Sequence, residues 1–172
     1  MSVGIENNNE IYWYALYTMP RTEKKVEQRL FLKNIEVYLP LIETIRIWTD
    51  RKKKIKIPLI PGFVFIRCKQ KEIIEALETE GVLNVVSYLK KPAKIHEYEI
   101  NNLKILINEP QFIQLNEELD ISEGDDVEVI RGPFIGLIGK CIRLNGKYRI
   151  IVEIKALDKK IEVSVAYSFL KK

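Results

Sequence analysis

The chain has 172 residues, of which 47% are hydrophobic and 30% are charged, and its formal net charge is +4. This composition is typical of a globular protein, so we do not expect a disordered chain, and the length suits one or two small domains. No apolar run approaches the roughly 20 residues that span a membrane. One histidine and two distant cysteines provide no Cys/His zinc site. We therefore expect a reduced, cytoplasmic protein without metal or membrane contact.

The chain begins with a polar, Asn-rich segment that differs from a signal peptide, and we expect a disordered tail over residues 1–10. Residues 11–17 are rich in aromatic side chains and predict the first strand. A helix is expected from Pro20 to about Lys33, because Pro suits the first helical turn and apolar residues follow at helical spacing. These elements open an α+β domain that we expect to span residues 11–108.

The centre of this domain is the segment Leu59–Arg67, in which Pro61-Gly62 separates two apolar arms. Pro lacks a backbone donor and Gly permits a positive φ, so the pair predicts a turn that leads into a buried strand from Phe63. Residues 46–56 hold six basic residues and one acid and predict a basic hairpin. A local positive patch attracts a polyanion better than a diffuse excess of charge does.

Shorter elements complete the first domain. Residues 36–41, 42–48 and 82–89 predict strands, and residues 71–77 and 97–108 predict helices with apolar residues at core spacing. Strands interleaved with short helices favour an α+β sandwich over repeated βαβ units.

The last third of the chain has a different character. Residues 109–120 contain four acids and no base, and we expect an extended linker there because like charges repel. Over residues 121–172 β-branched residues mostly alternate and glycines punctuate them, so about five short strands should form a small closed barrel.

The search for catalytic motifs is negative. The sequence has no Walker-type phosphate loop, no dinucleotide-binding glycine pattern and no nucleophile elbow. His96 stands beside Glu97 without a recognisable nucleophile. The adjacent acids Asp125 and Asp126 lie in an expected turn, where acids are common. We therefore expect no enzyme, no catalytic residue and no cofactor; a small enzyme that uses the two aspartates is the weakest alternative.

Several motifs follow one another in a recognisable order: Trp13–Tyr17, a Pro- and basic-rich helix start, Tyr38–Pro40, Pro61–Ile66, Thr79–Val82 and Gly124–Gly139. The first five resemble the N-terminal (NGN) domains of the NusG family, and the last looks like a KOW motif. The resemblance covers about residues 11–170. It implies an NGN domain, with an antiparallel sheet flanked by helices, followed by an all-β, SH3-like KOW barrel.

Within this family the chain looks most like the specialised RfaH-like and UpxY-like antiterminators of polysaccharide operons. The tail from Gly146–Val152 through Ala156-Leu157 and the ending Tyr167–Leu170 resemble the UpxY-like proteins. In housekeeping members the barrel loop after the third strand carries a Phe-Gly-Arg tip, whereas here it reads Lys155–Lys159. Contact of the barrel with ribosomal protein uS10 or with Rho is therefore left open. The resemblance implies a monomeric bacterial elongation and antitermination factor that serves particular operons.

The resemblance also implies that the NGN domain binds the β′ clamp helices of bacterial RNA polymerase through an apolar patch. By motif match the patch comprises Tyr17, Ile60, Phe63 and Phe65. Trp13 and Tyr14 are expected in the core. Aromatic residues on a rigid strand make good anchors, because they lose few rotamers on binding. The alternative is that all of these aromatic side chains are internal.

The family places the basic hairpin near the non-template DNA strand at the upstream fork of the transcription bubble. The nucleic-acid-binding residues expected here are Arg21, Lys24, Lys25, Trp48, Arg51, Lys52, Lys53, Lys54 and Lys56. Their cationic groups would contact phosphates, and Trp48 would stack on an exposed base. A solvated loop is the alternative for the hairpin. A KOW-type RNA-binding or ribosome-associated protein is the alternative for the whole chain.

The RfaH-like relatives raise the question of whether the second domain folds as a helical hairpin that masks the polymerase site. The β-branched runs Ile150–Val152 and Ile161–Val165 favour a sheet, and Pro133 with its neighbouring glycines disfavours a helix. We therefore expect a β-barrel that is joined flexibly and leaves the polymerase patch open.

Overall fold

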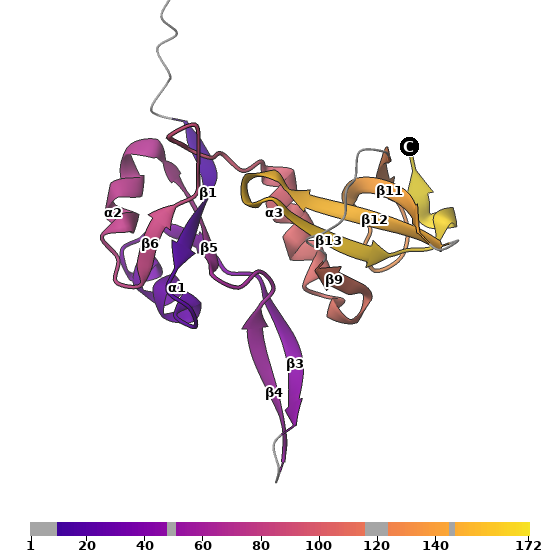
Figure 1. The fold of residues 1–172 in the computed structure, drawn as a ribbon, viewed down its shortest axis with the longest axis horizontal. Coiled ribbons are helices and arrows are strands. Elements are labelled where there is room, and N and C mark those ends of the chain that lie inside the picture. The colour runs from indigo at the N-terminus through magenta and orange to yellow at the C-terminus, as the bar shows by residue number, and fades with distance from the viewer. Residues whose placement is uncertain (1–9, 48–50, 116–123, 145–146) are drawn as a thin grey trace, which may run out of the picture. The chain divides into compact units, whose positions relative to one another are not determined.

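The computed structural model describes residues 10–47, 51–115, 124–144 and 147–172 (Figure 1). The chain divides into two compact units, one formed by residues 1–39 and 60–96 and the other by residues 40–59 and 97–172. The tail expected over residues 1–10 lies almost wholly outside the described residues.

The first unit contains a four-stranded antiparallel sheet with the strand order β2-β5-β1-β6. Its strands are β1 (Ile11–Thr18), β2 (Glu36–Tyr38), β5 (Phe63–Lys69) and β6 (Val82–Val85). The central strands β1 and β5 pair from Ile11 opposite Lys69 to Tyr17 opposite Phe63. The central position of β5 agrees with the buried strand that its apolar run predicts.

Helices and a small hairpin complete this unit. They are α1 (Glu23–Leu32), the 3-10 turn Gln70–Glu72, α2 (Ile73–Leu77), β7 (Ser87–Tyr88) and β8 (Lys91–Pro92). Helix α1 packs on β2 and β5, and α2 packs beside β6. The strand expected over residues 82–89 is thus divided between two sheets, β6 in one and β7 in the other.

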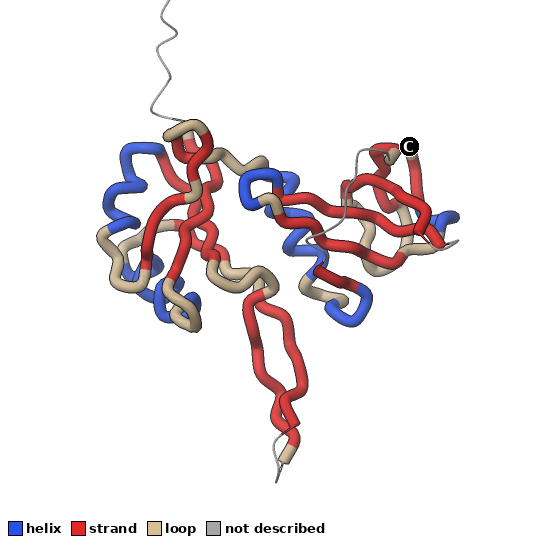
Figure 2. Tube along the Cα trace, in the orientation of Figure 1, coloured by secondary structure: helices blue, strands red, loops and turns tan. Residues whose placement is uncertain are grey.

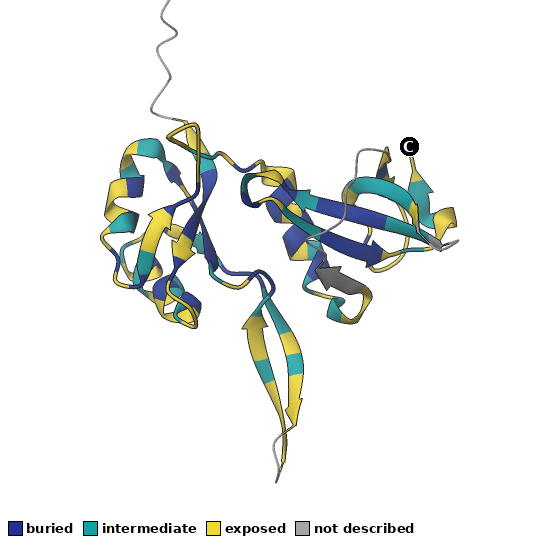
Figure 3. Cartoon of the chain, in the orientation of Figure 1, coloured by how far each residue is buried: buried dark blue, intermediate teal, exposed yellow. Residues whose placement is uncertain are grey.

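The core of the first unit is built by the two central strands. Trp13–Leu16 are four consecutive buried residues, and so are Phe63–Ile66 (Figure 3). Because neighbouring side chains on a strand point to opposite faces, four buried residues in a row mean that both faces are covered. Trp13 and Tyr14 therefore lie in the core, as the sequence predicts.

The second unit includes an antiparallel hairpin of β3 (Leu41–Ile47) and β4 (Lys52–Pro58), drawn in red in Figure 2. Its register runs from Leu41 opposite Pro58 to Ile47 opposite Lys52. The structure thus confirms the basic hairpin.

The rest of the second unit is helix α3 (Glu97–Leu106) and a six-stranded antiparallel sheet, the barrel, with the order β14-β10-β11-β12-β13-β9. The strands are β9 (Ile113–Leu115), β10 (Asp125–Val129), β11 (Ile138–Leu144), β12 (Lys147–Ile154), β13 (Lys159–Ser164) and β14 (Leu170–Lys171). Short 3-10 turns stand at Pro110–Phe112, Lys155–Leu157 and Tyr167–Phe169. The predicted all-β fold of this region is confirmed, because its described part from residue 124 contains strands and 3-10 turns only.

One barrel strand comes from the segment that we expected to be a linker. Ile113 lies opposite Val163 and Leu115 opposite Ile161, so β9 extends the sheet at β13. The linker predicted over residues 109–120 therefore does not include this segment. The acidic composition of the region predicted a linker, but its short apolar alternation is also typical of a strand that can pair with a sheet edge.

Helix α3 is attached to the barrel by two buried polar side chains. Asn102, which is 2% exposed, donates from Nδ2 to the carbonyl of Ile138 (2.8 Å) and accepts at Oδ1 from the N–H of the same residue (3.0 Å). Glu99, which is 1% exposed, accepts at Oε1 from the backbone N–H of Lys155 (3.0 Å). These contacts hold α3 to the backbone of β11 and to the end of β12. Within the second unit, α3 and the barrel are therefore fixed to each other by hydrogen bonds.

Candidate functional site

The turn Pro61-Gly62 is fixed by hydrogen bonds that connect three elements. The N–H of Thr18, at the end of β1, donates to the carbonyl of Gly62 (2.9 Å). The N–H of Gly62 donates to Oε1 of Glu23, in the first turn of α1 (2.9 Å). Gly62 has a φ of +83°, which glycine adopts without strain. The turn predicted from the sequence therefore holds the start of β5 against the end of β1.

This turn positions the aromatic pair Tyr17 and Phe63. The two residues are cross-strand partners, and their ring centroids lie 4.8 Å apart with the planes inclined by 46°. Tyr17 is 43% exposed, whereas Phe63 is 9% exposed. The pair thus presents one accessible aromatic side chain that is supported by a nearly buried ring, which suits an anchor.

The other two residues of the expected polymerase patch lie in the core. Ile60 is 2% exposed and Phe65 is fully buried, with its ring centroid 6.5 Å from that of Tyr38. In this conformation neither side chain is available to a partner. Tyr17 is therefore the accessible residue of the patch, and the nearly buried Phe63 supports it.

The basic hairpin carries positive charge on both of its faces. Residues directly opposite one another share a face, so one face holds the pairs Ile47–Lys52, Ile45–Lys54 and Glu43–Lys56 and the other holds Arg46–Lys53. These basic side chains are all exposed (Figure 3). The hairpin can therefore contact phosphates from either side.

Two details refine the set of residues expected at the hairpin. Arg46 was not among them, yet it lies opposite Lys53 and doubles the charge on that face. The period-2 alternation of β3 is the sequence signal that could have identified it. Lys54 lies 3.0 Å from a carboxylate oxygen of Glu43, an exposed ion pair that contributes little stability. Trp48 lies outside the described residues.

The remaining basic residues of the expected interface are Arg21, Lys24 and Lys25. All three are exposed, and they stand before and within α1 of the first unit. Arg21 adopts a left-handed conformation, with a φ of +65°. The expected nucleic-acid-binding residues thus fall into one group in each compact unit.

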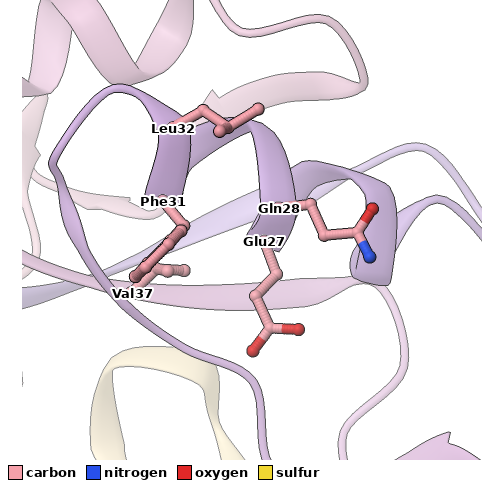
Figure 4. Close-up of a pocket in the computed structure, with 5 residues that line it drawn as sticks. All are labelled: Glu27, Gln28, Phe31, Leu32 and Val37. Carbon is pink, nitrogen blue, oxygen red and sulfur yellow. The ribbon is translucent and has the colours of Figure 1, made fainter.

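An apolar hollow of about 440 Å³ lies in the first unit, lined by Glu27, Gln28, Phe31, Leu32 and Val37 (Figure 4). Phe31 and Leu32 are 71% and 79% exposed. Burial raises the pKa of the Glu27 carboxyl group above its usual value, although Lys24 opposes the shift. The helical pattern does not predict this hollow, because Phe31 and Leu32 stand at the end of α1 outside the stripe that the helix buries, and Val37 lies on β2.

The two cysteines are unsuited to nucleophilic chemistry. Burial, with a contribution from the charge of Glu72, raises the pKa of the Cys68 thiol to about 12. Burial also raises the pKa of Cys141, and Asp125 adds to this rise. Both thiols therefore stay protonated near neutral pH, and the thiolate is the reactive form.

The described residues contain no group of three or more His, Cys, Asp or Glu that could hold a metal ion. No helix in the described part is long and apolar enough to cross a membrane.

Comparison with known proteins supplies the family. The model of the family described as "Transcription termination factor nusG" matches residues 11–104. The "Transcription termination/antitermination protein NusG" of Borreliella burgdorferi is 26% identical over 175 residues, covering 88% of this chain and 94% of the relative. That of Thermus thermophilus is 26% identical over 179 residues, covering 89% and 95%.

Among solved structures, one titled "Domain interaction in Thermotoga maritima NusG" matches 96% of this chain and 99% of its own, with a TM-score of 0.51 and 22% identity. At this identity the match shows a shared fold, which includes both the N-terminal sheet with its helices and the C-terminal all-β region.

Proposed function

Because the chain belongs to the NusG family of transcription termination and antitermination factors, we propose that it binds the clamp of bacterial RNA polymerase and the upstream non-template DNA strand. In this proposal the protein is an elongation factor that favours antitermination at particular operons. The observation that carries the proposal is the combination of an accessible aromatic anchor in the N-terminal domain with a separate, exposed basic hairpin.

The polymerase contact is assigned to Tyr17 with Phe63. Tyr17 is accessible, and its neighbour Phe63 and the hydrogen-bonded turn at Gly62 restrict its movement. An anchor that is ordered before binding loses little conformational entropy when a partner covers it. A clamp helix with an apolar stripe would therefore gain a rigid contact at this position.

The DNA contact is assigned to the hairpin, with Arg46 added to the basic residues found by sequence. Its exposed cations stand on both faces of a two-stranded ribbon. Single-stranded nucleic acid is bound by positively charged grooves and ribbons that follow the backbone, and each phosphate contact releases counterions. Arg21, Lys24 and Lys25 of the first unit would add further phosphate contacts.

The mechanism that follows is mechanical rather than chemical. A ligand shifts a conformational equilibrium only by as much as it binds one state better than the other. A factor that holds the closed clamp and the upstream fork together would favour the elongating state over the paused and terminating states. The specialised, operon-directed role rests on the resemblance of Gly146–Val152 and Tyr167–Leu170 to UpxY-like proteins.

The direct test of the polymerase contact is the affinity of the full chain for a polymerase clamp-helix fragment. Tyr17→Ala should weaken binding by about 2 kcal/mol, or roughly 30-fold, since a truncated aromatic anchor loses most of its contact area. The matched control is Tyr88→Ala, because Tyr88 is a 73% exposed tyrosine of the same unit. Equal affinity of the two variants would remove Tyr17 from the interface. Purification of ribosomes rather than polymerase with the tagged chain would contradict the proposed partner.

A further inference from the structure

The C-terminal end of α1 exposes two large apolar side chains that take no part in the core of the first unit. Phe31 is 71% exposed and Leu32 is 79% exposed, whereas Val26 and Leu30 on the same helix are fully buried. A single apolar residue at a surface is common, but these two stand together and line the hollow of about 440 Å³ with Val37 of β2. The end of α1 therefore presents an apolar surface with a depression in it.

The hollow has a helix on one side and the edge of a sheet on the other. Glu27 and Phe31 stand four residues apart and form one row along α1. Gln28 and Leu32 form the row beside it. Val37 belongs to β2, the strand at the end of the sheet, and Figure 4 shows Phe31 extending from the helix towards it. Rows of residues four apart are the ridges against which a second helix packs.

The carboxyl group of Glu27 restricts which partner the hollow can accept. Burial raises the pKa of this group, and the charge of Lys24 opposes the rise only in part. A partner that covers the hollow removes more water from the carboxylate, which costs free energy unless that partner supplies a cation and hydrogen-bond donors. Arginine suits this role, because its guanidinium group binds a carboxylate through two parallel hydrogen bonds and is common at the centre of interfaces. The occupant should therefore bring apolar side chains and one arginine.

This surface is separate from the proposed polymerase contact. Residues directly opposite one another on paired strands share a face of the sheet. Tyr17 lies opposite Phe63 on β5. Val37 lies opposite Ile66 on the same strand. Phe63 and Ile66 are three residues apart and therefore point to opposite faces. Tyr17 and the hollow thus belong to opposite faces of the sheet, and a partner at one leaves the other accessible.

We propose that the hollow beside α1 binds an amphipathic helix of a partner protein. Apolar side chains one turn apart on that helix fill the space between Phe31, Leu32 and Val37, and an arginine next to them pairs with Glu27. A helix is the expected form, because its ridge packs against the rows of α1 and its apolar face fits a groove. The interaction goes beyond the proposed function, since it requires neither DNA nor the polymerase clamp.

The test places the photoreactive amino acid p-benzoylphenylalanine at the position of Gln28 in the full chain and crosslinks it in the source cells. The expected product joins this position to a segment of another protein that mass spectrometry maps to an amphipathic helix with an arginine beside its apolar positions. The matched control carries the same group in place of Leu83, which is 57% exposed in the same unit, and should not give this product. No product, a product with a second copy of this chain, or a segment without arginine would overturn the proposal.

Two substitutions in the crosslinking chain decide whether the contact has the proposed chemistry. Phe31→Asp should reduce the product at least about tenfold, because it replaces an apolar contact by a charge that the partner does not match. Glu27→Arg should reduce it similarly, and changing the arginine of the partner to Glu should restore it, because the charges are then exchanged. Undiminished product in either variant, or no restoration, would contradict the pairing.

A last pair of measurements separates folding and polymerase binding from the proposed contact. Phe31 is largely exposed, so its variant should unfold at the temperature of the parent, and a lower temperature makes the charge exchange at Glu27 the deciding result. Tyr17→Ala should leave the crosslink unchanged. Loss of the crosslink in that variant would show that the hollow belongs to the clamp contact and would overturn a separate site. A failed clamp contact with an unchanged crosslink would refute only the proposed function.

Discussion

Strand β5 and the hairpin β3–β4 are close in sequence but use apolar side chains in opposite ways. Ile66 on β5 is fully buried, whereas Ile47 on the hairpin is 72% exposed. Strand β5 pairs with β1 on one side and β2 on the other and is covered by α1, while β3 and β4 pair only with each other. A two-stranded ribbon has no second layer against which to bury a face.

This difference shows that accessibility depends on what covers a strand, not on its residue types. The aromatic run of β5 suggested a binding surface, but most of it forms the core. The basic charges of the hairpin can also be interpreted as those of a solvated loop. Its side chains are nevertheless exposed and available to a partner. In the proposed function, β5 therefore forms the core that supports the binding residues, whereas the hairpin contacts DNA and Tyr17 contacts the polymerase.

The largest expected effect is a difference in the free energy of unfolding when an isoleucine is truncated to alanine in each of the two regions. Ile66→Ala should lower the free energy of unfolding by about 3 kcal/mol, because it removes buried methyl groups and leaves a cavity. Ile47→Ala should change it by less than about 0.5 kcal/mol. Urea denaturation of both variants measures the contrast. Similar losses in the two variants would mean that the hairpin is packed against a partner layer.

The next effect concerns the reactivity of thiols. Cys68 on β5 is 5% exposed and its pKa is raised to about 12 by burial, with a contribution from Glu72. An alkylating reagent at pH 8 should therefore modify Cys68 at least about 100 times more slowly than a cysteine introduced on the hairpin by Lys54→Cys. Mass spectrometry of peptides over time measures both rates. Comparable rates would show that β5 opens readily.

A smaller effect separates buried from exposed polar contacts. Asn102→Ala leaves the backbone N–H and carbonyl of Ile138 without their partner and should cost about 2 kcal/mol of stability. Its matched control is Asn101→Ala, an exposed neighbour on the same helix. On the hairpin, Glu43→Gln removes the exposed ion pair with Lys54 and should cost under about 0.5 kcal/mol. Equal thermal stability of Asn102→Ala and Asn101→Ala would contradict the attachment of α3 to the barrel.

The sequence predicted the secondary-structure elements better than the tertiary contacts and the burial of their side chains. The Pro61-Gly62 turn, the hairpin and the all-β region over residues 121–172 follow from local chemistry, and the described residues confirm them. The full burial of Phe65 was not predictable, because alternation does not reveal whether one face of a strand is covered or both. Asn102 and Glu99 look like the polar face of a helix, and only the tertiary structure shows that they bind the barrel backbone. Ile113–Leu115 was missed because three residues are too few for a periodic signal.

The most direct test of the account is the salt dependence of binding to DNA with an unpaired bubble. Changing Lys52, Lys53 and Lys54 to Gln should weaken binding about tenfold at low salt and reduce the slope of log affinity against log salt by about 2, because up to three phosphate contacts are lost. The control changes Lys71, Lys90 and Lys91 to Gln, which removes the same charge from exposed positions of the first unit. We expect the control to keep the slope of the parent. An unchanged slope in the hairpin variant, or the same loss in both variants, would contradict the assignment of DNA contact to the hairpin.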